Sequence, residues 1–78
     1  MKVKITKPDS ILYEGEARLV QLPGTGGLFE IMHQHAPIIS ALAKGTLRVV
    51  VDDLETLTFD IRGGVVQCQK DEVLILVQ

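Results

Sequence analysis

Aromatic residues are scarce in this sequence: tryptophan is absent, and Tyr13, Phe29 and Phe59 are the only three. The folded interior must therefore be filled by aliphatic side chains. This is feasible because hydrophobic residues make up 46% of the 78 positions. A chain of this length forms one domain, and it buries only about 60% of the surface that its unfolded form exposes. Contact with a partner would supplement so small a core.

Three further shortages exclude other classes of protein. A single cysteine, Cys68, excludes an internal disulfide and fits a reducing compartment. The formal net charge is −2, so the basic patch of a nucleic-acid-binding protein is missing and we expect no nucleic-acid partner. The longest apolar run, Val73–Val77, is too short to cross a bilayer. We therefore expect membrane association to be indirect, through another protein.

Alternation of apolar and polar residues is the main structural signal. It is clearest over residues 2–6, 46–51 and 56–61, where each segment ends at a turn signal such as Pro8-Asp9-Ser10 or Asp52-Asp53. Short strands separated by turns every eight to twelve residues or so are typical of sandwiches and barrels. We therefore predict a single all-β domain over residues 1–78. It should be a small two-sheet β-sandwich or flattened barrel of short strands with little or no helix.

Three segments depart from simple alternation. The apolar parity changes between Leu19 and Val20, which predicts a bulge in residues 17–22 or a segment apolar on both faces. The segment 38–44 is the only candidate helix, but it spans barely two turns, so we expect a strand or irregular structure. Residues 73–77 are apolar on both faces, which predicts a central strand or one covered from both sides.

No catalytic constellation stands out. The loop Gly24–Gly27 lacks the following lysine and hydroxyl of a phosphate-binding P-loop, so it is read as a tight loop. Cys68 alternates with Val66, which predicts a core side chain rather than a reactive thiol. The carboxylates lie mainly at turns, and no pair has the pattern of a general acid and base. We therefore expect no cofactor and no enzymatic activity.

His33 and His35 leave an alternative open. On a strand, residues two apart project from one face, so both imidazoles would be able to bind one metal ion. Zinc needs at least one more protein ligand, which Cys68, Glu30 or Asp60 would supply only through the tertiary fold. The alternative function is thus a small metal-binding β-barrel enzyme using His33 and His35. In the plainer interpretation, one histidine lies in a polar loop and the other packs beside Pro37.

Five segments in order carry a family resemblance: Leu22–Gly27, His35–Ile39, Leu42–Val49, Gly63–Val66 and Val73–Leu76. Together they resemble the amino-terminal β-sandwich of the epsilon subunit of F-type ATP synthase, whose mitochondrial equivalent is called delta. The resemblance covers essentially the whole chain. The sequence departs from the family at four places. The family commonly has glycine where Glu30 stands and Pro-Gly where His33-Gln34 stand; it has glutamate where Gln67 stands and an apolar residue where Cys68 stands. We therefore expect altered geometry around residues 30–34.

The resemblance implies a non-catalytic subunit of the central stalk, or rotor, which binds the gamma subunit and the c-ring and so couples proton-driven rotation to ATP synthesis. It also implies a peripheral location on the cytoplasmic face of the bacterial inner membrane. Family members usually continue into a carboxy-terminal helical hairpin, which binds nucleotide in some of them. The sequence stops at Gln78, so we expect neither hairpin nor nucleotide. By position in the family, the c-ring-facing loop is Gly26, Gly27 and Leu28, and the gamma-facing residues are Lys7, His35, Ala36 and Pro37.

Overall fold

The computed structural model describes residues 1–78 and contains nine strands and no helix, so no helix in it is long and apolar enough to cross a membrane. The strands follow one another along the chain at short intervals, as the alternation predicted. They are β1 (Lys2–Lys7), β2 (Ser10–Glu16), β3 (Leu19–Gly24), β4 (Gly27–Met32), β5 (Ile38–Leu42), β6 (Gly45–Val50), β7 (Thr56–Ile61), β8 (Gly64–Gln69) and β9 (Glu72–Val77).

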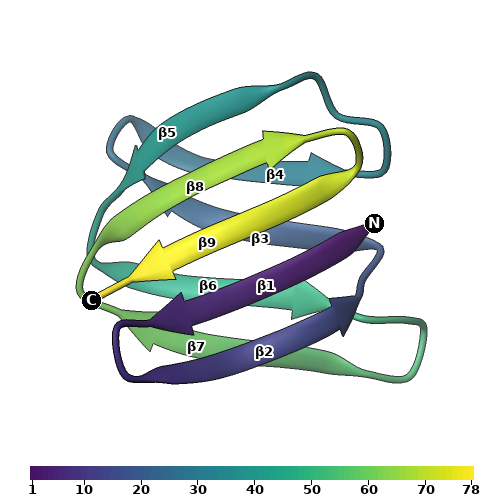
Figure 1. Cartoon of the computed structure of the whole chain (residues 1–78), viewed down its shortest axis with the longest axis horizontal. Coiled ribbons are helices and arrows are strands. Elements are labelled where there is room, and N and C mark those ends of the chain that lie inside the picture. Colours follow the sequence, from purple (N-terminus) through teal and green to yellow (C-terminus); the bar gives the residue numbers. More distant parts are fainter.

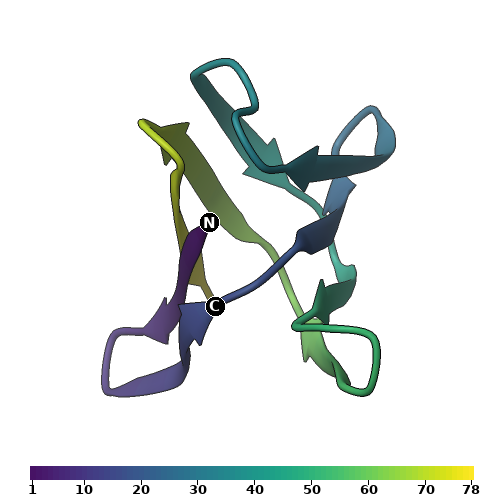
Figure 2. The same cartoon turned by 90° about the vertical axis from the view of Figure 1, so that its right-hand side faces the viewer.

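The strands form two layers. One layer has the order β2-β1-β9-β8-β5, and the other has the order β4-β3-β6-β7. A single bridge between Gly24 of β3 and Leu42 of β5 joins them into one curled sheet, and the two layers face each other in Figures 1 and 2. All neighbours are antiparallel except β1 and β9, which run parallel. The predicted all-β, two-sheet fold is confirmed.

The core between the layers is aliphatic, as the scarcity of aromatic residues required. Its fifteen buried residues are all apolar, and the largest that are fully buried are Ile5, Leu22, Ile31, Leu47 and Ile75. Cys68 belongs to this core. Every buried polar side-chain atom has a hydrogen-bond partner. The interior is therefore held by burial of apolar surface, without any buried charge.

The connecting turns gather at two opposite ends of the sandwich (Figure 1). One end, called here the amino end, carries Met1, the β4–β5 loop (residues 33–37), the β6–β7 turn and the β8–β9 turn. The other, called here the carboxy end, carries the β1–β2 turn, the β3–β4 tip, the β5–β6 turn and Gln78. This follows from strand direction, because each hairpin brings the chain back along its neighbour.

For residues 17–22 the bulge is not formed, but the alternative, a segment apolar on both faces, is confirmed. The parity change lies inside β3, where Leu19 is half-buried, Val20 is fully buried on the opposite face, and the register against β4 and β6 is unbroken. Residues 17–18 come just before it and connect β2 to β3. The chain crosses between the layers here, and the N–H of Arg18 donates to the Val50 carbonyl at 2.8 Å. An irregular register occurs elsewhere, between Ile5 and Thr6 where β1 pairs with β2.

The other two irregular segments form strands. Residues 38–42 form β5, in line with the strand expectation, and the candidate helix is not formed. Residues 72–77 form β9, which lies centrally between β1 and β8 as predicted. Its outer face is not covered within this chain, since Leu76 keeps 50% of its surface exposed.

Candidate binding surfaces

The outer face of the five-stranded layer carries a continuous apolar surface, called here the outer patch. Cross-strand partners form a row of apolar or uncharged residues across this face. The row runs through Ala41 of β5, Val65 of β8, Leu76 of β9 and Thr6 of β1. Exposure is substantial: 75% for Ile39, 50% for Leu76 and 42% for Val65. The outer patch consists of Ile11, Ile39, Ala41, Val65, Leu74 and Leu76. Contiguous exposed apolar surface of this kind is typical of protein–protein contact.

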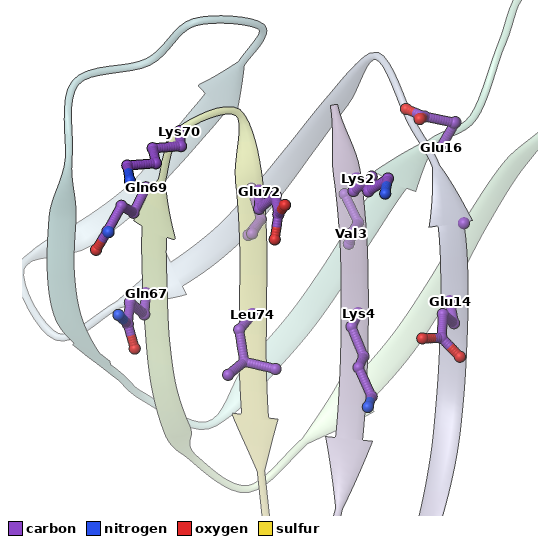
Figure 3. A pocket seen from close by; sticks show the side chains of 12 residues that line it. Lys2, Val3, Lys4, Glu14, Glu16, Gln67, Gln69, Lys70, Glu72 and Leu74 are labelled. Atoms are coloured by element: carbon purple, nitrogen blue, oxygen red, sulfur yellow. The ribbon is translucent and has the colours of Figure 1, made fainter.

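The same outer face becomes charged toward the amino end. Here an open hollow of about 830 Å³ lies over β1, β2, β8 and β9. Lys2 and Lys4 of β1 stand between Glu14 and Glu16 of β2 on one side and Glu72 of β9 on the other (Figure 3). Positive and negative groups alternate across the strands, so the hollow has no dominant charge with which to select an ion. The apolar half of the face is therefore the better candidate for binding.

The residues predicted to face gamma border this outer face at its two ends. Lys7 ends β1 at the carboxy end and, with Val65 and Leu76, lines a second shallow depression of about 350 Å³. His35, Ala36 and Pro37 are exposed in the β4–β5 loop at the amino end, immediately before β5. The fold does not bring Lys7 next to this loop, but it places both on the border of one sheet face.

The residues predicted to face the c-ring form the β3–β4 tip. Gly27 has φ +126°, a conformation that L side chains rarely adopt. A Cβ built on Gly26 or Gly27 would meet no atom within 4 Å, so the tip projects away from the rest of the domain. Leu28 is 68% exposed. The tip belongs to the other layer from the outer patch, so the two surfaces are separate.

The metal-binding alternative required His33 and His35 to lie on one strand, but the structure has no strand at these two residues. His33 and His35 lie in the loop after β4, where the Nδ1 atoms have different partners. Nδ1 of His33 is 3.0 Å from Oδ1 of Asp71, and Nδ1 of His35 is 2.7 Å from the Ala36 carbonyl oxygen. No group of three or more His, Cys, Asp or Glu side chains has a metal-binding arrangement. The shared-face premise is therefore wrong.

Sequence reasoning missed a polar cluster around Asp71 in the β8–β9 turn. The backbone N–H of Gln34 donates to Oδ1 of Asp71 at 3.0 Å, and the amino-terminal ammonium lies 3.9 Å from Oδ2. The hydrogen bond from Gln34, then the nearby His33 and the ammonium, hold the pKa of the Asp71 carboxyl below its ordinary value of 3.8, outweighing partial burial. The only available signal was the departure at residues 33–34; the structure gives Gln34 a φ of +61°.

The outer patch was also missed as a unit. Its signal was present in β9, whose apolar residues occupy both faces, and in Val65, which breaks the alternation of β8. Recognition needed the strand order, because β2, β5 and the β8–β9 hairpin are far apart in the chain.

Comparison with known proteins gives a consistent result. Residues 1–78 match the family described as ATP synthase, Delta/Epsilon chain, beta-sandwich domain. The ATP synthase epsilon chain of Chlorobium limicola is 34% identical over 77 residues, which cover 99% of this chain and 88% of that protein. The epsilon chain of Sulfurimonas denitrificans is 32% identical over 78 residues, which cover 100% of this chain and 60% of that protein. The chain thus spans most of one relative and under two thirds of another.

Solved structures share the fold. One chain in the mitochondrial ATP synthase of Euglena gracilis superimposes with a TM-score of 0.89 at 18% identity, covering 96% of this chain and 48% of that chain. A chain in the central stalk and c-ring of the Tetrahymena thermophila mitochondrial ATP synthase gives a TM-score of 0.84 at 14% identity, covering 99% of this chain and 62% of that chain. At these identities the likeness concerns the β-sandwich itself.

Proposed function

Because this chain belongs to the delta/epsilon β-sandwich family of ATP synthase, we propose that it joins the gamma subunit to the c-ring within the rotor. The chain is an epsilon-type subunit of the central stalk region, and its role is structural or regulatory, not catalytic. By holding two rotor components together, it would transmit proton-driven rotation toward ATP synthesis. The observation that carries the proposal is the outer patch.

The outer patch supports gamma binding on energetic grounds. Its six residues lie on four of the five strands of that layer, and its most exposed member, Ile39, comes just after the loop that carries His35, Ala36 and Pro37. Burying such a surface against a partner removes apolar area from water at about 25 cal/mol per Å². Lys7 borders the opposite end of the patch. A partner lying along this face would contact both gamma-facing segments at once.

The β3–β4 tip supports c-ring binding separately. Gly26 and Gly27 leave open space around the backbone, and Leu28 presents an exposed apolar side chain. Since the tip lies on the other layer, occupation of the outer patch leaves it accessible. Two independent surfaces are what a subunit that links two partners requires.

The location follows from the same proposal. The chain is associated with the membrane-bound ATP synthase complex, and we place it peripherally on the cytoplasmic face of the bacterial inner membrane. Contact with the membrane is then indirect, through the c-ring. We propose that residues 1–78 act as one sandwich domain.

Pairwise binding assays with purified gamma and a reconstituted c-ring test the proposal. Leu76→Glu puts a charge in the outer patch and should weaken gamma binding about tenfold or more, because central apolar contacts dominate interfaces. Leu28→Asp should weaken c-ring binding and leave gamma binding intact. Leu54→Glu is the matched control, since Leu54 is 97% exposed in the β6–β7 turn, outside both surfaces. Circular dichroism verifies folding of each variant.

The proposal is wrong if Leu76→Glu and Leu28→Asp bind both partners as tightly as the parent chain. Failure of the parent chain to co-purify with gamma would instead indicate a free-standing interaction domain that only shares the sandwich.

A further inference from the structure

The β4–β5 loop is short, crosses between the two layers and has one internal backbone hydrogen bond, from the N–H of His35 to the Met32 carbonyl at 3.1 Å. Asp71 anchors the loop to the rest of the domain. Oδ1 of that carboxylate accepts from the Gln34 N–H at 3.0 Å and lies 3.0 Å from Nδ1 of His33. One oxygen atom therefore holds two consecutive residues of the loop that presents His35, Ala36 and Pro37.

Gln34 needs this anchor. Its φ of +61° lies in the left-handed region, which is unfavourable for residues with a side chain. A non-glycine residue keeps such a conformation only where its surroundings impose it. The Asp71 carboxylate supplies the constraint by fixing the direction of the Gln34 N–H. Without that acceptor, we expect Gln34 to leave the left-handed region and the loop to change conformation.

Asp71 is a rigid anchor. Only two residues separate β8 from β9, and both have positive φ, +53° at Lys70 and +62° at Asp71, as in the tight type I′ hairpin turn. The Asp71 carbonyl also accepts from the Lys2 N–H at 3.1 Å, which ties the turn to β1. The carboxylate is thus fixed by three strands, whereas the loop that it holds is exposed.

We propose that Asp71, His33 and Gln34 form a pH-dependent latch that positions the β4–β5 loop for its partner. The binding role of the loop rests on the proposed function; the latch itself does not. An imidazole changes charge between about pH 5 and 8. In the lower part of this range, protonated His33 makes a charge-assisted bond to Asp71, which is stronger than the neutral hydrogen bond. The latch is then closed; at higher pH it loosens.

Among the charged groups around the cluster, His33 is the one that contacts Oδ1 of Asp71, the same oxygen that accepts from the Gln34 N–H. The carboxylate of Asp71 stays ionised throughout the range, because its pKa is lowered. The amino-terminal ammonium lies 3.9 Å from Asp71 and 3.3 Å from Oε2 of Glu16, so its charge is shared between two carboxylates. The remaining titratable or charged groups around the cluster are Lys2, Cys68, Lys70 and Glu72 from the adjoining strands and turn, and His35 from the loop.

Amide hydrogen exchange of the 78-residue chain tests the latch, with the protection factor of the Gln34 amide measured at pH 5.5 and 7.5. We expect the protection factor to be about two- to five-fold greater at the lower pH, because an exposed ion pair typically contributes up to about 1 kcal/mol. His33→Asn should abolish the difference. His35→Asn, in the same loop but bonded to Ala36, should retain it and serves as the matched control.

Two variants separate positioning from folding. Asp71→Asn should lower Gln34 protection at both pH values, while the amide of the core residue Val66 stays protected. Adding Gln34→Gly to Asp71→Asn should restore the loop, because glycine tolerates a positive φ without the bond. The latch is refuted if the parent chain shows no pH-dependent Gln34 protection, or if His33→Asn keeps it.

Binding of gamma at the two pH values then tests whether the latch affects function. If gamma binds the loop, its affinity should fall by a similar factor between pH 5.5 and 7.5 for the parent chain, and not for His33→Asn. A pH-dependent loop with pH-independent gamma binding would uphold the latch and contradict the proposed gamma contact at this loop.

Discussion

Replacement of Gly64 by alanine is the most direct test of the sheet arrangement. Gly64 begins β8 and pairs with Val77 of β9. A Cβ at this position would clash with the Leu76 carbonyl oxygen and lie 3.1 Å from the Val77 Cα. Ordinary non-bonded contacts between carbon atoms lie at about 3.5–4.0 Å. The added atom meets backbone in a paired strand, which no side-chain rotation relieves, so β8 and β9 must separate at the carboxy end.

The magnitude follows from two opposing terms. Overpacking costs about 1–3 kcal/mol, and a clash with backbone belongs at the upper end. Alanine also restricts the unfolded chain, which returns about 0.4–1 kcal/mol. We therefore expect Gly64→Ala to lower the free energy of unfolding by about 2 kcal/mol. For a small domain with a urea m-value near 1 kcal/mol per M, the midpoint falls by about 2 M.

Gly26→Ala provides the matched control. A Cβ at Gly26 meets no atom within 4 Å, so the same substitution adds no clash there. Its urea midpoint should stay within about 0.5 M of the parent, since surface substitutions seldom change stability by more than ~0.5 kcal/mol. A Gly64→Ala midpoint equal to that of Gly26→Ala would refute the reasoning, because it would mean that β8 and β9 are not paired in this register.

Three further predictions concern the core and the titratable groups. Ile75→Ala should lower the free energy of unfolding, measured in urea, by about 2–5 kcal/mol. Phe59 is half-buried on the edge strand β7, so Phe59→Ala should cost less than the roughly 3–5 kcal/mol of a fully buried phenylalanine. A larger loss for Phe59→Ala than for Ile75→Ala would contradict the burial pattern. The thiol of Cys68 is buried and its pKa is raised by that burial and by Asp71, so thiol-specific reagents should modify it only as fast as the domain opens; immediate modification in native buffer would place it at the surface. Because the pKa of Asp71 is lowered by folding, its stabilising effect is complete above 3.8 and is lost as the pH falls through the lower native value. Asp71→Asn should therefore be less stable than the parent at pH 6, with the difference shrinking in strong acid; a constant difference down to pH 2 would contradict this sign.

The proposed binding surfaces were predictable to different degrees. The β3–β4 tip was evident from Gly24–Gly27, because a glycine-rich interruption between alternating segments is a turn in almost any fold. The metal alternative failed because His33 and His35 were placed on a strand that ends at Met32. Lys7 and Pro37 were both identified, but their separation to opposite ends of one sheet face depends on strand direction, which alternation does not specify.

The sequence by itself determined the all-β class, the aliphatic core and most of the strands. These are local properties: alternation chooses the face on which each side chain lies, and turn residues choose where the chain reverses. Tertiary structure alone decided that β1 lies beside β9, that Ala41 and Val65 adjoin in one patch, and that Asp71 reaches Gln34, 37 residues away in the chain. Those neighbours arise from strand order and register, which depend on how all nine strands share one core and not on any segment of the sequence.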